Sequence, residues 1–176
     1  MPIVIASHAY AQDEALVGSV KIEGNKRVDA STLLYYIKTR QGEPLSRKQI
    51  SKDIEQIYSL GQFKDIRVET RQGVKGLEIV FIVEEFPSFG DVILYGNKEV
   101  EDSDIHSALE FKRGEAFQEY MIKEAEEKIK SLYQEKGFFF AKIGVVSKKS
   151  ARDLINIHVR VREGEKVGIK SIRFYG

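Results

Sequence analysis

The sequence contains no cysteine and only three histidines among its 176 residues. The absence of cysteine excludes disulfide bonds, thiolate metal sites and cysteine nucleophiles. An excess of one charge is also missing, because 28 Lys and Arg residues are balanced by 27 Asp and Glu residues, for a formal net charge of +1. Proteins that bind nucleic acids usually carry a strong positive excess, so the overall charge argues against that class.

Long hydrophobic runs are missing as well. No apolar run approaches the roughly 18 residues that cross a bilayer, so no transmembrane helix is predicted. No Walker loop, GxSxG, HExxH or GxGxxG motif occurs. The histidines are scattered over a leader, a short helix and a strand, at positions 8, 106 and 158. We therefore predict a folded protein that is not an enzyme and that needs no cofactor or metal ion.

The first residues are predicted to lie outside the folded part. Ala9-Tyr10-Ala11 precedes Gln12 with the small-x-small pattern of a signal-peptidase site, and the short apolar run 3–6 comes before it. A basic start and a longer apolar stretch would complete a signal peptide, and both are missing. Residues 1–16 are thus either the remnant of an export signal or an ordinary disordered leader.

An internal repeat organises the rest of the chain. Residues 18–43 align without a gap with residues 90–115, and 9 of 26 positions are identical, where chance gives about one or two. The identical pairs are Gly18/Gly90, Val20/Val92, Gly24/Gly96, Asn25/Asn97, Lys26/Lys98, Val28/Val100, Ser31/Ser103, Gly42/Gly114 and Glu43/Glu115. Further on, 58–63 matches 133–138 and 77–85 matches 155–163. Residues 168–176 begin a third copy, which predicts a longer tandem array.

The repeat predicts domains over residues 17–86 and 87–165, followed by the first strand of a third domain at 166–176. Each unit reads strand, helix, helix, strand, strand. In the first unit, alternation marks a strand before Gly24, and Ser46 with Gln49 forms a capping pair that opens the second helix. Three strands and two amphipathic helices around one core form an α+β fold with a mixed sheet packed on two helices.

The strands of a unit differ in their apolar content. Residues 79–83 are all apolar, so the last strand is predicted to be central. The preceding strand carries charges from position 64 to 71, which suits an exposed edge. In the second unit, the corresponding strands are predicted over 139–146 and 154–161.

These features resemble the POTRA domains of BamA-like outer-membrane β-barrel assembly factors. The phrases VKIEGNKRV (20–28) and IYSLGQFKDIRVE (57–69) are similar to the first domain of that family, and GFFFAKIGVV (137–146) to a following one. The resemblance covers residues 17–176. It implies a periplasmic receptor and chaperone region, followed in the parent chain by a C-terminal β-barrel. Unfolded β-barrel proteins and accessory lipoproteins are the implied partners.

Strand addition explains how such a domain binds clients of varied sequence, because an exposed sheet edge offers main-chain hydrogen bonds to any extended chain. We predict client-binding edges over residues 64–70 in the first unit and 139–145 in the second. The candidate residues are Lys64, Ile66, Arg67, Val68, Phe139, Lys142 and Ile143. The inward Ile66 and Val68 are also readily explained as stabilising core residues.

The connection between the units is predicted to act as a hinge. Phe86-Pro87-Ser88 joins them in few residues, and proline restricts the backbone, so we expect a limited range of orientations. Two alternatives remain for the whole chain: a POTRA region of a related translocation-assembly or secretion transporter, and a KH-like nucleic-acid-binding module. Against the latter, no GxxG joins the helices of either unit.

Overall fold

The computed structural model describes residues 15–150 and 153–168. The chain divides into two compact units, Met1–Glu85 and Phe86–Gly176. The predicted leader lies almost wholly outside the described residues, and so does most of the predicted third-domain strand. Residues 166–168, which are described, form no helix or strand.

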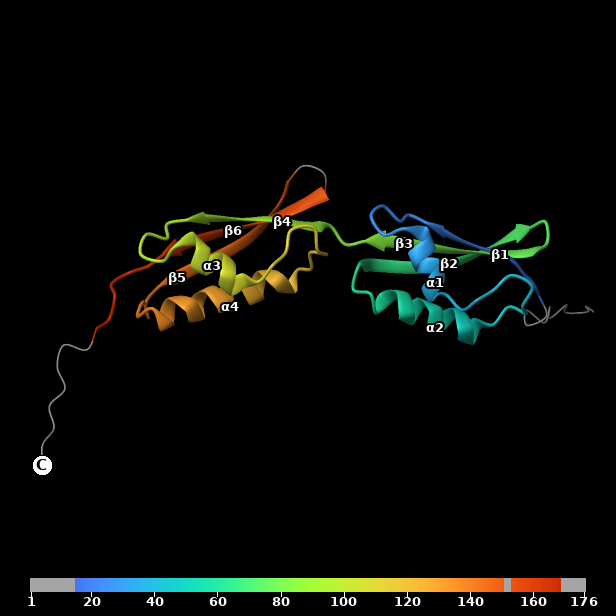
Figure 1. Cartoon of the computed structure of the whole chain (residues 1–176), viewed down its shortest axis with the longest axis horizontal. Coiled ribbons are helices and arrows are strands. Elements are labelled where there is room, and N and C mark those ends of the chain that lie inside the picture. The colour runs from blue at the N-terminus through green and yellow to red at the C-terminus, as the bar shows by residue number, and fades with distance from the viewer. Residues whose placement is uncertain (1–14, 151–152, 169–176) are drawn as a thin grey trace, which may run out of the picture. The chain divides into compact units, whose positions relative to one another are not determined.

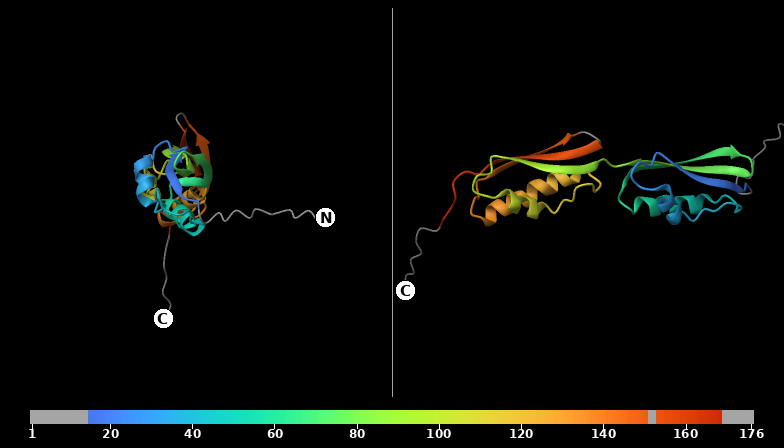
Figure 2. Two further views of the ribbon diagram at one scale, coloured as in Figure 1. Left: turned by 90° about the vertical axis from the view of Figure 1, so that its right-hand side faces the viewer. Right: turned by 45° about the horizontal axis from the view of Figure 1, so that its top comes forward.

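The first unit consists of β1 (Val17–Glu23), α1 (Ala30–Tyr36), α2 (Arg47–Tyr58), β2 (Phe63–Gly73) and β3 (Gly76–Glu85). Its sheet has the order β1-β3-β2, with β1 parallel and β2 antiparallel to β3. Both helices cover the same face of this sheet (Figures 1 and 2). The predicted α+β fold, with the last strand in the centre, is confirmed.

The core of the first unit is formed by the apolar residues that recur on one side of each strand and helix. Alternate residues of β3, among them Ile79 and Phe81, are fully buried beneath the helices. Leu33 of α1 and Ile57 of α2 close the core from the other side and are also fully buried. The predicted capping pair is present, since Ser46 Oγ accepts a hydrogen bond from the backbone N–H of Gln49 at 3.2 Å.

The second unit repeats this arrangement with β4 (Ser88–Tyr95), α3 (Asp102–Leu109), α4 (Tyr120–Glu135), β5 (Lys142–Lys149) and β6 (Leu154–Arg162). The strand order is β4-β6-β5, so β6 is the central strand. Its core is built mainly from one stripe on each helix and the inward residues of β6. Ile105, Ala125, Ile129, Ile157 and Val159 are fully buried members of this core.

The strand predicted from Phe139 starts three residues later, at Lys142. Phe139 and Phe140 lie in a turn and are 57% and 72% exposed. The turn forms because Phe138 is anchored in the core and its carbonyl accepts a hydrogen bond from Ala141 N–H at 3.2 Å. The prediction of Phe139 as a strand residue was therefore wrong. The apolar composition of residues 138–141 is typical of a strand, but these residues form a turn.

The connection between β3 and β4 consists of Phe86 and Pro87. Ser88, which was predicted to belong to the hinge, is the first residue of β4 and is buried. It pairs with Leu154 of β6. Of the three predicted hinge residues, two therefore lie outside regular structure and one belongs to the second sheet.

A buried carboxylate ties the end of each unit to the turn that follows its first strand. Glu85, the last residue of β3, accepts hydrogen bonds from the backbone N–H groups of Lys26 (2.7 Å), Arg27 (2.9 Å) and Val28 (3.1 Å). Burial by itself would raise the pKa of this carboxyl. The backbone donors and the Arg27 guanidinium, at 2.9 Å, outweigh burial and lower the pKa to about 2.

In the second unit, Glu163 makes the equivalent hydrogen bonds to the turn that follows β4. This carboxylate accepts from the N–H groups of Lys98 at 2.8 Å and Glu99 at 3.0 Å, and from the Tyr133 hydroxyl at 3.1 Å. Burial opposes ionisation, but these donors hold its pKa below the ordinary value. The turn itself needs glycine: Gly96 has a φ of +85°, and a Cβ there would lie 2.3 Å from the Val161 carbonyl oxygen.

Candidate functional site

Among the residues that the structure describes, the outer strands β2 and β5 each pair with a single strand, the central strand of their sheet. The opposite outer strands are partly covered by loops of their own unit. Val17 of β1 exchanges backbone hydrogen bonds with residues 42 and 43, and Phe89 of β4 does so with residues 114 and 115. Loop backbone thus covers the start of β1 and of β4. Among the described residues, no such loop pairs with β2 or β5, the strands singled out in the sequence.

The predicted residues of the first edge all lie on β2, but they face two ways. Ile66 and Val68 direct their side chains into the core, and Ile66 is only 6% exposed. Lys64 and Arg67 are on the outside, where Lys64 pairs with Glu84 at 3.3 Å. What these residues share at the edge is therefore the backbone rather than a side-chain surface.

One backbone donor of the β2 edge is already occupied. The N–H of Ile66 donates to the hydroxyl oxygen of Tyr58, at the end of α2, at a distance of 3.0 Å. Because backbone groups in a strand point alternately to its two sides, the groups of Val68 and Thr70 face the same outer edge. Tyr58 thus blocks the start of this edge. The match of residues 58–63 with 133–138 in the sequence does not reveal this role of Tyr58.

The equivalent tyrosine of the second unit has a different role. Tyr133 is fully buried, whereas Tyr58 is 41% exposed, and the Tyr133 hydroxyl donates to Glu163 rather than contacting a strand edge. Burial and this carboxylate raise the pKa of Tyr133. Among the residues that the structure describes, no tyrosine hydroxyl caps the backbone of β5.

The second edge contains two of its three predicted residues. Lys142 and Ile143 lie on β5, while Phe139 lies in the turn before it. Ser150 N–H donates to Leu154 O at 2.7 Å, so this pair is hydrogen-bonded. Bonded and non-bonded pairs alternate along an antiparallel ladder. It follows that the backbone groups of residues 143, 145 and 147 point to the outer edge.

An apolar groove runs beside the first edge. A hollow of about 430 Å³ opens between α2 and the sheet of the first unit. Its walls include Ile50 and Ile54 of α2, Val68 and Thr70 of β2, and Leu77 of β3. A strand added to β2 would direct every second side chain to the helix side of the sheet, where this groove lies.

The described parts of the chain hold no group of three or more His, Cys, Asp or Glu residues placed to bind a metal ion. Within the same residues, no helix combines the length and the apolar character that crossing a membrane requires. Of the three histidines, His106 is exposed on α3 and His158 lies on β6 beside Tyr95, with ring centroids 6.0 Å apart.

Two sheets of the same topology, each with a helix pair and one free antiparallel edge, define a tandem repeat protein. The sequence matches the POTRA family, described as surface antigen variable number repeat, over residues 15–85 and 87–164. The chain belongs to the POTRA family.

Two BamA proteins align with most of this chain, across both repeats. The chain is 29% identical over 161 residues to the outer membrane protein assembly factor BamA of Nitratidesulfovibrio vulgaris, and 26% identical over 163 residues to BamA of Neisseria meningitidis serogroup B. Each alignment covers 91% of this chain and 20% of the relative. The chain therefore spans about a fifth of the length of these relatives.

The fold is also found among solved structures. The N-terminal domain of Omp85 from Thermosynechococcus elongatus superposes with a TM-score of 0.56 at 22% sequence identity. The superposition covers 82% of this chain and 61% of the Omp85 chain. This likeness confirms the fold.

Proposed function

We propose that the chain is the periplasmic receptor region of an outer-membrane protein assembly factor, and that it binds unfolded β-barrel clients by strand addition. The relatives support the assignment to an outer-membrane protein assembly factor, because two BamA proteins each align with 91% of the chain. The observation that carries the mechanism is the free antiparallel edge of each sheet, on β2 and on β5. The C-terminal barrel of the parent chain and accessory lipoproteins are further proposed partners.

Strand addition fits the chemistry of these edges. Outward backbone groups of β5, at residues 143, 145 and 147, offer hydrogen bonds that do not depend on the client sequence. At β2, the groove lined by Ile50 and Ile54 would accept the apolar side chains that alternate along a barrel strand. Binding without a fixed sequence is what a receptor for many barrel proteins requires.

The two edges are predicted to differ in availability. The Tyr58 hydroxyl already occupies the outward N–H of Ile66, so a client strand must displace it or pair only with the later part of β2. Because β5 lacks such a cap among the described residues, its edge binds without this cost. We therefore expect the second unit to bind clients more readily than the first.

Site-specific crosslinking tests this function. A photoreactive side chain is placed at Arg67 of β2 or Lys142 of β5, with exposed Lys52 of α2 and Lys123 of α4 as control positions. The probe is a synthetic peptide with the sequence of one strand of an outer-membrane barrel. We expect crosslinks at the two strand positions; crosslinks on the helices alone would overturn strand addition.

The Tyr58→Phe variant sharpens the result. The change removes one hydroxyl and frees the Ile66 N–H, so crosslinking at Arg67 should increase while crosslinking at Lys142 stays the same. The second edge thus serves as an internal control. An equal rise at both positions would point to general loosening of the chain and would contradict the proposed cap.

A further inference from the structure

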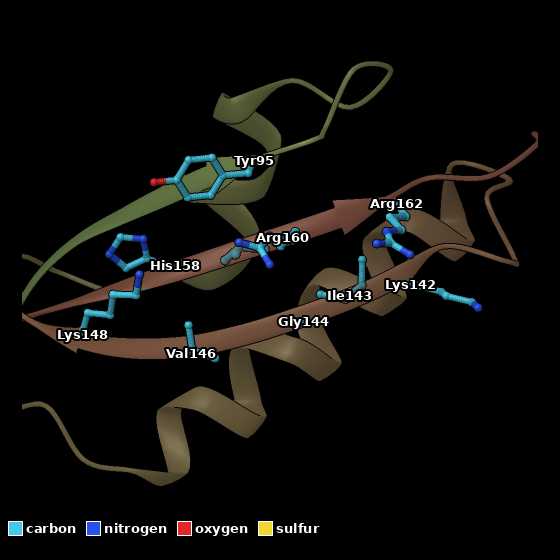
Figure 3. Close-up of a pocket in the computed structure, with 10 residues that line it drawn as sticks. Tyr95, Lys142, Ile143, Gly144, Val146, Lys148, His158, Arg160 and Arg162 are labelled. Atoms are coloured by element: carbon cyan, nitrogen blue, oxygen red, sulfur yellow. The ribbon is translucent and has the colours of Figure 1, made fainter.

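The sheet of the second unit has one face that α3 and α4 leave open. On β6, Ile157, Val159 and Val161 point into the core, so the residues between them point to the opposite side. Figure 3 shows this open face, with side chains from three strands around a hollow of about 390 Å³. Its lining includes Tyr95 of β4, His158, Arg160 and Arg162 of β6, and Lys142, Gly144, Val146 and Lys148 of β5.

Four cations on this open face lack a carboxylate partner. Within residues 15–150 and 153–168, no ion pair involves Lys142, Lys148, Arg160 or Arg162, and no Asp or Glu lines the hollow. Lys142 lies directly opposite Arg162 in the β5–β6 ladder, an arrangement of like charges that destabilises a sheet. A bound anion would remove this repulsion.

Nearby acidic groups are already engaged elsewhere. Asp91 of β4 pairs with Arg113 at 2.6 Å, and Asp153 pairs with Lys149 at 2.8 Å. Glu163 faces the turn at residues 98–100, as described above. The positive charge of the open face is therefore not neutralised from β4, from the β5–β6 hairpin or from the end of β6.

The corresponding face of the first unit shows that the fold does not require this charge. There, Lys21 pairs with Glu78 at 2.6 Å, and Arg71 pairs with Glu23 at 2.6 Å and with Glu69 at 3.1 Å. Both cations are therefore paired with carboxylates on the same face of the sheet. The unmatched cations are thus a property of the second unit alone, within the described residues.

A glycine opens the cationic face towards the free edge. Gly144 lies opposite Arg160 in the ladder, and it places no side chain between Arg160 and the outer side of β5. A strand added to β5 would lie two strand spacings from β6, about 10 Å. A glutamate on that strand, level with Gly144, has a free path to the Arg160 guanidinium across this gap.

We propose that the open face makes the β5 edge select extended segments with acidic side chains at every second position. The proposal rests on strand addition, the function proposed above. Backbone groups at 143, 145 and 147 would hold the segment, and its alternate carboxylates would lie over Lys142, Gly144 and Val146, within reach of Arg160. Side chains of a strand face one side at every second residue, which is the spacing of these positions. One extended ligand can therefore bind the backbone groups of the edge and pair with the cations of the open face.

The test uses the whole chain and three peptides that alternate valine with a second residue, which is Glu, Gln or Lys. The photoreactive group at Lys142 remains the probe of the edge, and affinity is measured by titration with unmodified protein. We expect the Glu peptide to bind about tenfold more tightly than the Gln peptide, from two or three cross-strand charge pairs. The Lys peptide should bind most weakly, and added salt should reduce the preference.

The Arg160→Gln/Arg162→Gln variant should lose the preference for Glu while keeping the binding of the Gln peptide. Its matched control is Lys123→Gln/Lys130→Gln, which removes the same charge from the exposed side of α4 and should change nothing. Equal binding of Glu and Gln peptides would overturn charge selection but leave strand addition intact. Absence of every peptide from the β5 edge would instead overturn strand addition.

Vesicles of phosphatidylglycerol and phosphatidylcholine distinguish a membrane from a peptide as the ligand. Binding to these vesicles that the Arg160→Gln/Arg162→Gln variant abolishes, with no difference between the peptides, would show that the face binds anionic lipid and would refute the proposal. A preference for the Glu peptide that the same variant abolishes would support it.

Discussion

Replacing Glu85 by glutamine tests whether a buried carboxylate fastens the first unit. The Glu85 side chain is only 3% exposed and accepts hydrogen bonds from three successive backbone N–H groups. Glutamine has nearly the same size, but it carries no charge and turns one acceptor into a donor. The Glu85→Gln variant therefore places an NH₂ group against backbone N–H donors.

The expected magnitude follows from the pKa. In the folded state it is about 2, against an ordinary value of 4.5, and this difference corresponds to about 3 kcal/mol of unfolding free energy at neutral pH. Because the folded-state pKa is the lower one, the stabilisation is complete above about pH 4.5 and is lost as the pH falls towards 2. Since glutamine keeps one acceptor, we expect a loss of about 2–3 kcal/mol near pH 7, and less than half of it near pH 3.

Hydrogen exchange of the β3 amides in the whole chain measures this loss, and the β6 amides serve as an internal reference. Glu84→Gln is the matched control, because Glu84 is the neighbouring residue, is 60% exposed and pairs with Lys64 at the surface. Its effect should stay below about 0.5 kcal/mol. A loss at Glu85 below about 1 kcal/mol, or one that is unchanged near pH 3, would refute the reasoning.

Two further predictions concern single residues. Asp53→Asn should destabilise the first unit by about 2–3 kcal/mol in urea unfolding, and less in acid, because this buried carboxylate accepts four hydrogen bonds that outweigh burial and lower its pKa. Gly96→Ala should cost the second unit more than about 2 kcal/mol, because φ is +85° and the new Cβ would lie 2.3 Å from the Val161 carbonyl oxygen. Gly114→Ala, with a φ of +90° but open space around it, should cost about 1 kcal/mol, and equal losses at the two glycines would contradict the steric argument.

The sequence was sufficient to predict the fold, because the spacing of apolar residues and the internal repeat both indicate the same order of strands and helices. The alternation that buries Ile79 and Phe81, together with the charges of the preceding strand, indicated the central and outer strands correctly. The apolar run before β5 led to a strand predicted three residues too early. Local composition does not reveal that Phe138 is buried in the core and that the next residues turn outward. A strand prediction based on composition has no way to detect such an anchor.

The candidate site was less predictable than the fold. The role of Tyr58 depends on the distance from its hydroxyl to the backbone of β2, and the equivalent tyrosine of the second unit, Tyr133, is buried instead. The cationic face depends on which residues lie across from one another, such as Gly144 and Arg160, and this register is set by the whole β5–β6 hairpin. Pairings between strands are tertiary information, so neither feature follows from a motif.

The topology of each sheet also has a consequence for the order of folding. In the described sheets the partner strand of β1 is β3 and that of β4 is β6, so the first strand of a unit pairs with a strand only when the last one is present. The carboxylate that fastens the turn after β1 belongs to Glu85, the final residue of that last strand. A chain that emerges with its N-terminus first therefore cannot close a unit gradually. The sheet of each repeat is complete only once its last strand, β3 or β6, is present.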